Sequence, residues 1–158
     1  MNIRKMTAAD KPAVMQIIRN TPAFLPIDVK VAEEVLDAYL EVPVGSEFHT
    51  FVAYKQETIS GYICFGPTPL TAGTWDVYWI ASAPAELGKG IGTALLAFAE
   101  EKIKEAQGRL ILIETASNPH YERAQCFYSA RNYDIVCTIP DFYSPGDHKI
   151  TFRKQIKK

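Results

Sequence analysis

The sequence has 158 residues, 47% of them hydrophobic, and its 17 Lys and Arg residues nearly balance its 18 Asp and Glu residues. This length is close to the commonest domain size and the apolar fraction is enough for a full core, so we expect one domain over residues 1–158. A net charge of −1, with no long run of like charges, provides no basic field for a nucleic acid. We therefore expect no nucleic-acid partner.

Membrane, disulfide and metal signals are also missing from the sequence. No apolar stretch approaches the ~20 residues that span a bilayer, and the first residues lack the apolar core of a signal peptide. We expect no membrane partner and a cytoplasmic location. Cys64, Cys126 and Cys137 are odd in number and widely spaced, which favours a role as core fillers over a disulfide framework. The three histidines have no ligand spacing, so no metal is expected.

The chain begins with a strand pattern followed by a helix pattern. Residues 2–6 suit a short strand, and Thr7 followed three residues later by Asp10 is typical of a helix N-cap with an acidic first turn. Apolar residues then recur at helical spacing until residues 20–26 break the pattern. The sequence thus predicts one amphipathic helix after the first strand.

A second helix is predicted to open at Asp28 or one of its neighbours, and Pro43 and Gly45 end that region. Its apolar stripe consists of Val31, Val35, Leu36 and Leu40.

The middle of the chain alternates between strand and helix patterns. Residues 48–54 and 59–65 are largely β-branched and aromatic, which predicts an antiparallel hairpin. A third such stretch covers residues 75–82, a helix is predicted over 92–106, and an apolar run at 110–113 suits a strand covered on both faces. This strand–helix–strand order predicts a right-handed crossover and a parallel pair. The centre of the fold is therefore α/β.

The last quarter of the chain is predicted to form a helix and a hairpin. Residues 119–131 have a helical apolar face, and Asn132 is a suitable left-handed stop. Residues 133–140 and 148–153 are predicted to form two strands around a turn, and the simplest arrangement for them is an antiparallel pair.

A glycine loop stands between a strand and a helix in residues 74–96. Gly88, Gly90 and Gly92 leave the backbone N–H groups open to an anion, and the N-terminus of the following helix adds a partial positive charge. This order predicts a site for a diphosphate, although a glycine cluster alone equally permits a tight turn.

Two familiar phosphate loops fit this spacing badly. A P-loop needs a glycine five residues before its Gly-Lys pair and a hydroxyl after the lysine, but Ala83 and Gly90 stand at those places. The dinucleotide fingerprint begun at Gly88 would place its third glycine at Thr93, where a side chain obstructs close helix–strand packing. Glu114 can still imitate that motif's acidic residue, so the objection to a nicotinamide-dependent oxidoreductase rests mainly on Thr93.

The second half of the chain pairs the glycine loop with an aromatic helix motif. The first motif is residues 78–84 followed by 88–96, and the second is Ala124-Gln125-Cys126-Phe127-Tyr128 with Asn132-Tyr133 beyond it. In order and separation they resemble the GNAT superfamily of N-acetyltransferases, and the resemblance covers nearly the whole chain. It implies an α/β (α+β) fold with a mixed, mostly antiparallel central sheet of about six or seven strands. The fourth and fifth strands would form a parallel pair, and about four helices would flank the sheet.

The resemblance also implies a reaction. An acetyl group would move from acetyl-CoA, the cosubstrate, to a primary amine of a small molecule, amino acid or protein by direct attack in a ternary complex, without a metal. Leu87 occupies the place where the family loop usually carries Gln or Arg, and it motivates a second hypothesis, a non-catalytic acyl-CoA-binding sensor or interaction module. Tyr128 argues for catalysis. Because exposed strand edges often pair, a homodimer is also expected.

Cofactor residues follow from the resemblance by position. They are Ile80, Ala81, Ser82, Gly88, Lys89, Gly90, Ile91, Gly92, Thr93, Asn118 and Tyr121. The loop N–H groups would hold the diphosphate, and backbone groups of Ile80 and Ser82 would pair with the pantetheine arm like an added strand. Tyr121 stands where many relatives have an Asn that contacts the arm, and Asn118 is a candidate substitute.

Tyr128 and Glu114 are the candidate catalytic residues. Tyr128 matches the family's usual acid and would protonate the leaving thiolate, although a packed helix aromatic is the alternative. An alkylamine is mostly protonated at neutral pH, so a base is needed as well. Glu114, after the apolar fifth strand, ranks before Asp76 on the fourth strand, and either carboxylate can instead be a solvated or structural group.

The acceptor is expected between the first helices and the final hairpin. Aromatic and acidic residues there suit a cationic amine, and they are Phe24, Tyr39, Asp141, Phe142, Tyr143 and Asp147. Ordinary turn chemistry at the tip of the hairpin explains part of this set equally well.

Overall fold

The computed structural model describes residues 1–42 and 44–156. Within them one sheet of seven strands has the order β1-β2-β3-β4-β5-β7-β6, and every pair is antiparallel except β4–β5. The strands are β1 (Asn2–Lys5), β2 (His49–Lys55), β3 (Thr58–Pro67), β4 (Thr74–Ser82), β5 (Leu110–Ala116), β6 (Asp134–Ser144) and β7 (Asp147–Gln155). The helices of the same residues are α1 (Lys11–Arg19), α2 (Pro26–Glu41), α3 (Ile91–Glu105) and α4 (Glu122–Ser129), with short 3-10 turns before α1, α3 and α4. The predicted fold class is confirmed, including the parallel pair.

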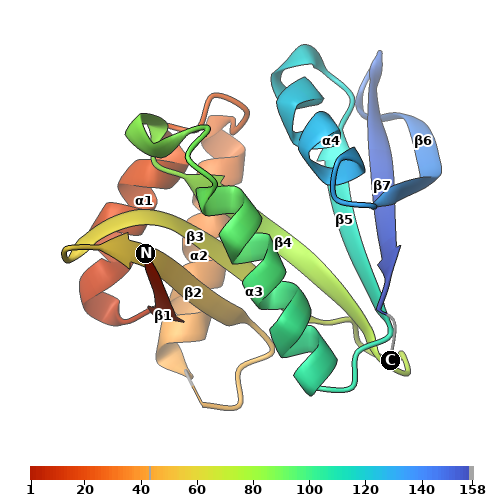
Figure 1. Cartoon of the computed structure of the whole chain (residues 1–158). Helices are drawn as coiled ribbons and strands as arrows, with labels where there is room; N and C mark the ends of the chain where they lie inside the picture. Colours follow the sequence, from red (N-terminus) through yellow and green to blue (C-terminus); the bar gives the residue numbers. More distant parts are fainter. Residues whose placement is uncertain (43, 157–158) are drawn as a thin grey trace.

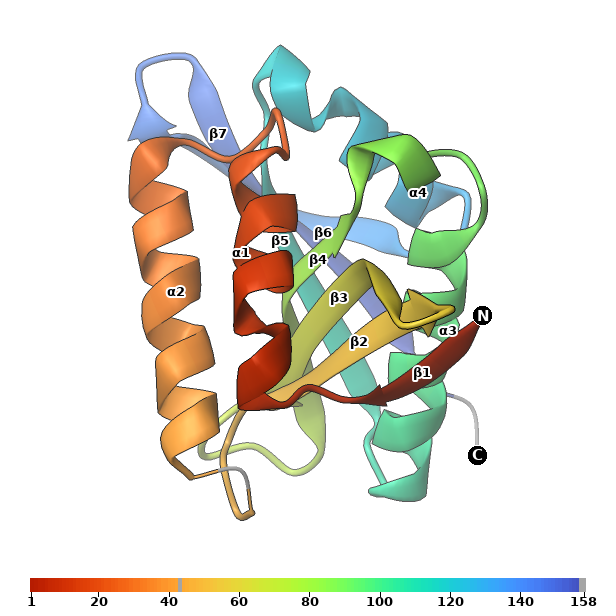
Figure 2. The same cartoon turned by 90° about the vertical axis from the view of Figure 1, so that its left-hand side faces the viewer.

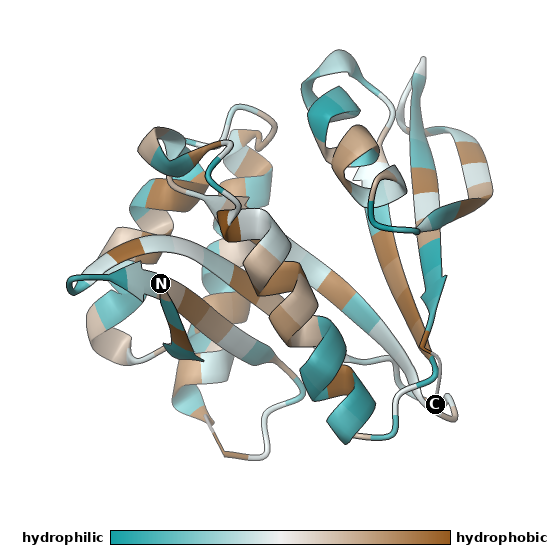
Figure 3. Cartoon of the chain, in the orientation of Figure 1, coloured by the Kyte–Doolittle hydropathy of each residue, from teal (hydrophilic) through white to brown (hydrophobic). Residues whose placement is uncertain are grey.

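Helices cover both faces of the first part of the sheet. Helices α1 and α2 lie on one face of β1–β4, while α3 lies on the other face (Figure 2). Buried side chains accordingly form two clusters, one around α1 and α2 and one that joins α3 to β5, β7 and α4. Figure 3 shows β5 as a largely apolar strand, which suits its place in the second cluster. The mixed sheet thus separates two hydrophobic cores.

The sheet opens between its two parallel strands. Residues Thr74–Val77 of β4 pair with Leu110–Ile113 of β5, and the pairing ends there. Tyr78 has no partner in β3, because Cys64 pairs with Trp79 and Phe65 with Val77, so a β-bulge bends β4 at this point. From there β4 follows β3, while β5, β7 and α4 lean away from it (Figure 1). This divergence creates the space for the site.

Several local predictions hold in the first half of the chain. Thr7 donates hydrogen bonds to Asp10 from its backbone N (2.8 Å) and from Oγ1 (2.9 Å), as expected at a helix start. The hairpin of β2 and β3 and the crossover through α3 are present. The predicted stripe of α2 is wrong in one position, because Val31 is exposed whereas Ala32 and Tyr39 are buried with Leu36. The helix turns this face toward α1, and Pro43 lies outside the described residues.

The second half of the chain confirms the predicted final hairpin and corrects the predicted role of two cysteines. Asn132 has the predicted left-handed backbone, with φ of 63°. Strand β7 lies between β5 and β6, so β6 forms the edge of the sheet and all its residues are exposed. Cys137 on this strand is therefore exposed. Cys126 on α4 is exposed as well, and among the three cysteines only Cys64 fills the core as predicted.

Strand β5 is buried along one face and only in part along the other. Ile111 and Ile113 point into the core under α3, whereas Leu112 is partly exposed and Glu114 is exposed. Among the described helices, α1 and α2 cover the opposite face only over β1–β4 (Figure 2). The continuous apolar run was therefore misleading about the second face, which stays open next to the predicted acceptor region.

Candidate active site

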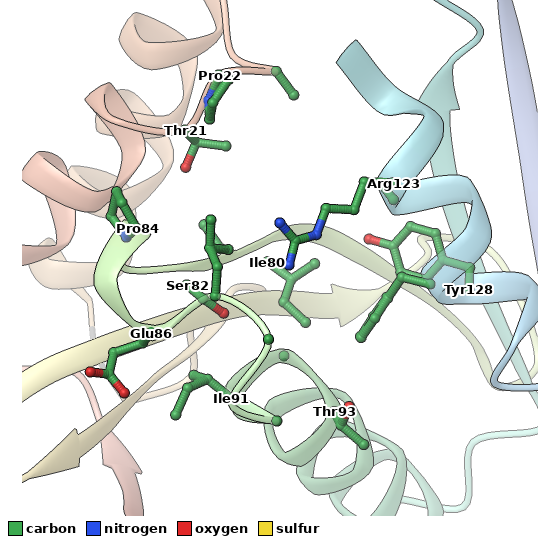
Figure 4. Close-up of a pocket in the computed structure, with 18 of the residues that line it drawn as sticks. Thr21, Pro22, Ile80, Ser82, Pro84, Glu86, Ile91, Thr93, Arg123 and Tyr128 are labelled. Carbon is green, nitrogen blue, oxygen red and sulfur yellow. The ribbon is translucent and has the colours of Figure 1, made fainter. Parts of the chain in front are cut away.

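A cavity of about 550 Å³ lies where β4 leaves β5 (Figure 4). Its wall consists of β4, the glycine loop, the start of α3, the inner face of α4, and the connection between α1 and α2. It brings together most of the residues predicted from the sequence: Ile80, Ala81, Ser82, Gly88, Gly90, Ile91, Gly92, Thr93 and Tyr128. The cavity thus joins the predicted phosphate loop to the predicted acid.

The glycine loop has an open cradle. Gly88 and Gly90 have φ values of 80° and 83°, a left-handed backbone that residues with a side chain rarely adopt. A Cβ atom added at either glycine would meet no other atom within 4 Å, so the space in front of the loop is free. Gly90 also caps α3, whose 15 residues direct their free N–H groups and positive dipole end toward this space. These features fit a diphosphate group.

The edge of β4 beside the cavity has no strand partner in the described chain. Ile80 and Ser82 pair with Ile63 and Gly61 of β3, and the pairing of β4 with β5 has already ended at Val77. Backbone groups on the far side of this segment are thus available to an extended ligand, as in strand addition. An amide-containing arm fits this edge.

Tyr128 is packed among aromatic rings and still reaches the cavity. Its ring centroid lies 5.3 Å from that of Phe127, 6.0 Å from that of Tyr133 and 5.6 Å from that of Phe152. Its hydroxyl faces the cavity (Figure 4). Burial raises the pKa of the Tyr128 phenol well above its usual value, so the group is protonated at neutral pH. A fixed, protonated phenol at this place can donate a proton.

Two arginines of the cavity wall were not anticipated from the sequence. Arg123 lies on α4 and Arg131 lies two residues after its last residue, Ser129. Each is four positions from Phe127, a spacing that places both on the side of the helix that carries Phe127. Arg131 donates to the Phe127 carbonyl (2.9 Å) and to Thr93 Oγ1, and its guanidinium lies 3.7 Å from the centroid of the Phe127 ring. It therefore ties α4 to the first turn of α3.

Three residues predicted to bind the cofactor lie outside the lining of the cavity. Lys89 pairs with Glu86 at 3.1 Å. The Asn118 amide donates to Asp147 (2.8 Å) and its oxygen accepts from the His120 backbone, so it fastens the final hairpin to the segment before α4. Tyr121 follows this segment, and burial together with the charge of Asp28 raises its pKa to about 12. The contacts of these three residues with a cofactor stay predictions.

The candidate bases differ in their surroundings. Glu114 is half-exposed on the open face of β5 and forms an ion pair with Lys149 at 3.3 Å. Asp76 on β4 accepts a hydrogen bond of 2.5 Å from Thr68 Oγ1. Neither carboxylate lines the cavity, so a role for Glu114 places the amine on the opposite side of the sheet from the glycine loop.

The opposite side of the sheet is acidic and aromatic. Tyr143 of the final hairpin is affected by three carboxylates, since burial first and then the charges of Glu114, Asp147 and Asp28 raise its pKa. Phe142 lies edge-on to Tyr143 with 4.9 Å between centroids, and the Lys149 ammonium is 4.3 Å from the Phe142 centroid. The α2 start, the end of β5 and the hairpin therefore converge.

Two members of the predicted acceptor set have structural roles instead. Tyr39 is buried and its hydroxyl donates to the Met6 carbonyl at 3.1 Å. The Asp147 carboxylate accepts hydrogen bonds from the backbone N atoms of Ser117 (3.0 Å) and Asn118 (3.1 Å).

Among the described residues, no group of three His, Cys, Asp or Glu side chains is placed to hold a metal ion. No helix in the described part of the chain is long and apolar enough to cross a bilayer.

Comparison with known proteins identifies the family. The family model of the acetyltransferase (GNAT) domain matches residues 46–135. A crystal structure of a GNAT-family acetyltransferase from Desulfovibrio desulfuricans is 32% identical, with a TM-score of 0.94 and 99% of each chain covered. No curated protein matches the sequence significantly.

Two more distant structures share the fold. An aminoglycoside 6′-N-acetyltransferase complexed with coenzyme A is 18% identical, with a TM-score of 0.79 over 100% of this chain and 98% of the other. The Escherichia coli ribosomal-protein-S18-alanine N-acetyltransferase is 16% identical, with a TM-score of 0.79 over 99% of this chain and 94% of the other. With its family model covering more than half of the sequence, this chain belongs to the GNAT family of acetyltransferases.

Proposed function

We propose that residues 1–158 act as one N-acetyltransferase domain that moves an acetyl group from acetyl-CoA to a primary amine. The observation that carries this proposal is the single cavity that contains an open glycine cradle, an unpaired edge of β4 and the Tyr128 hydroxyl. A cradle for the diphosphate, an edge for the pantetheine amides and an acid for the thiolate are the parts that a CoA thioester requires. The structurally similar aminoglycoside acetyltransferase, solved with coenzyme A, supports the same ligand.

The loop and the strand would bind and orient the cosubstrate. Backbone N–H groups at Gly88–Thr93 face the diphosphate, and the α3 dipole adds favourable electrostatics there. The thioester supplies an activated acetyl group, and the edge of β4 from Ile80 to Ser82 holds the arm in an extended conformation. The reacting carbon is thereby directed into the opening between β4 and β5.

Tyr128 would act as the general acid. When the amine attacks, the C–S bond breaks and the sulfur takes the electron pair, so a proton from the Tyr128 hydroxyl yields the thiol. The raised pKa keeps this proton on the phenol before the reaction. Its aromatic neighbours Phe127, Tyr133 and Phe152 hold the ring in one orientation.

Glu114 would act on the acceptor side. An ammonium group must lose a proton before it attacks, and a carboxylate on the open face of β5 can draw in the cation and accept that proton through water. The nearby carboxylate of Asp28 and the ring of Tyr143 favour a cationic acceptor as well. The acceptor we propose is a small-molecule or peptide amine that carries a positive charge in solution. Relatives named for aminoglycosides and for a ribosomal-protein alanine agree with an amine of either kind.

The proposal is tested by binding and by turnover. Calorimetry with acetyl-CoA should show binding, and thiol release should then be followed against a panel of aminoglycosides, amino acids, polyamines and peptides with a free N-terminal alanine or lysine. Binding with release for at least one cationic amine is expected. Absence of acetyl-CoA binding contradicts the proposal, and binding without release for every acceptor favours an acyl-CoA-binding module instead.

We also propose a homodimer in which the edge strand β6 takes part. Its backbone edge is unpaired among the described strands, and Ile135, Val136 and Ile139 expose between 40% and 56% of their surface. An exposed apolar edge is a ready pairing surface for a second copy of the same strand.

A further inference from the structure

Two arginines line the cavity on its α4 side, Arg123 on the helix itself and Arg131 in the turn after it, and they are held in different ways. Arg131 is fixed by its bonds to Phe127 and Thr93 and by its stacking on the Phe127 ring. Arg123 forms neither a hydrogen bond nor an ion pair of its guanidinium with any residue of the described chain. It extends from α4 toward the middle of the cavity, across from the glycine loop (Figure 4). Arg123 is thus a solvent-exposed cation on the cavity wall that has no charged or hydrogen-bonding partner among the described residues.

The charge of the cavity is strongly one-sided. Among the described residues that line it, Glu86 is the only acid, and its carboxylate is paired with Lys89. The opposite wall contributes backbone N–H groups and the positive end of α3. Guanidinium groups on one wall and N–H donors on the other are complementary to a ligand that carries several negative charges.

The glycine loop itself offers little side-chain polarity. Leu87, in the middle of the loop, is aliphatic and 46% exposed, and Lys89 is turned to Glu86 outside the lining of the cavity. Side-chain contacts to an anion in the cradle must therefore come from another element. Arg123 is the described residue of the facing helix whose guanidinium is free to make them.

We propose that Arg123 binds a phosphate group of the cosubstrate and so forms the polar contact that Leu87 does not provide. This inference rests on the function proposed above. The guanidinium fork matches two oxygens of one phosphate, either in the diphosphate or in the 3′-phosphate of an acyl-CoA. Arg131 acts as a positioning residue, because its bond to Thr93 keeps α4 at a fixed place beside the cradle.

The test measures how one substitution changes the affinity of the protein for three ligands. Arg123→Gln and the wild-type protein are titrated by calorimetry with acetyl-CoA, with its dephospho form lacking the 3′-phosphate, and with 3′-phospho-ADP, which has every phosphate and no pantetheine arm. Loss of a charge-assisted contact should weaken acetyl-CoA and 3′-phospho-ADP binding by the same factor, about 10- to 100-fold. A loss that persists with the dephospho form assigns the contact to the diphosphate, and a loss that vanishes assigns it to the 3′-phosphate.

Two matched variants control for charge and for shape. Arg153→Gln removes the same charge from the exposed side of β7, away from the cavity, and should bind every ligand like the wild type. Arg123→Lys keeps the positive charge and loses the planar guanidinium that can bind two oxygens, so its affinity should lie between those of Arg123→Gln and the wild type. Melting temperatures of all variants establish that each is folded.

Two results overturn the inference. One is an Arg123→Gln protein that binds acetyl-CoA within twofold of the wild type. The other is a loss seen with acetyl-CoA and absent with 3′-phospho-ADP, because Arg123 would then contact the pantetheine arm. Failure of the wild-type protein to bind acetyl-CoA refutes the proposed function instead, so the two failures are distinguishable.

Discussion

Replacing Gly90 with alanine should separate backbone strain from cofactor binding. At φ of 83°, an alanine is strained by about 1–2 kcal/mol, because its Cβ crowds the neighbouring carbonyl. No other atom lies within 4 Å of that Cβ, so no clash adds to this figure. For a chain of this length each kcal/mol lowers the melting temperature by about 2–4 °C, which gives an expected decrease of about 2–8 °C.

The same methyl group would stand in the diphosphate cradle. It would keep the anion from one loop N–H group, worth about 1.5–3 kcal/mol to a charged partner, so acetyl-CoA affinity should fall about 10- to 150-fold. Gly146 is a matched control, because its φ is 82° and its added Cβ also meets nothing within 4 Å. It lies in the turn of the β6–β7 hairpin, outside the cavity.

The assay is calorimetry with acetyl-CoA together with a thermal melt of each variant. Gly90→Ala and Gly146→Ala should lose similar stability, and only Gly90→Ala should lose affinity. If both variants bind acetyl-CoA like the wild type, the cradle is not the diphosphate site and the reasoning is refuted.

Four further substitutions test the acid, the base, the N-terminal ion pair and the dimer. Tyr128→Phe keeps the ring packing and should lower kcat about 10²- to 10⁴-fold with little change in KM for acetyl-CoA; unchanged turnover would rule out the acid. Glu114→Gln should abolish the acidic limb of the kcat/KM pH profile, and a retained limb would eliminate this base. The hydrogen bond from Arg4 holds the pKa of Asp10 down to about 2, below its usual 3.8, so the ionised carboxylate stabilises the fold above about pH 4. Asp10→Asn should therefore lower the free energy of unfolding by about 2 kcal/mol at pH 7 in urea titrations, and the difference should disappear as the pH falls through 2; a constant difference would contradict this. Ile135→Lys should shift the protein from dimer to monomer in size-exclusion chromatography with light scattering, and a wild-type monomer would refute pairing through β6.

The elements of the fold were predictable because their signals are local. The apolar stretches of β2, β3 and β4, and the apolar face of α3, depend on residues within one element, and all four elements formed as expected. The left-handed backbone at Asn132 is likewise a property of the residue and its immediate neighbours. The GNAT family was also identifiable, since its two motifs are short segments in a fixed order, and the family model confirms it.

Long-range contacts explain the errors. Val31 is as apolar as Leu36, and only the position of α1 decides that Leu36 is buried and Val31 exposed. Cys137 is exposed because β7, and not β6, joins β5 in the sheet. Tyr39 does not belong to the acceptor region, because it is buried next to the end of β1, where its hydroxyl donates a hydrogen bond to the Met6 carbonyl. No feature of the neighbouring sequence indicates any of these three outcomes.

The sequence by itself determined the family, the order of the elements and the loop that suits a diphosphate, because propensity, periodicity and motif spacing act over a few residues. Only the tertiary structure decided what faces that loop. The end of β4–β5 pairing at Val77 opens the sheet, and α4 with the turn after it then brings Arg123, Tyr128 and Arg131 to the far wall of the same cavity. Residues more than 30 positions from the glycine loop in sequence meet it only because a bulge and a crossover fix where α4 packs, and that depends on the whole core at once.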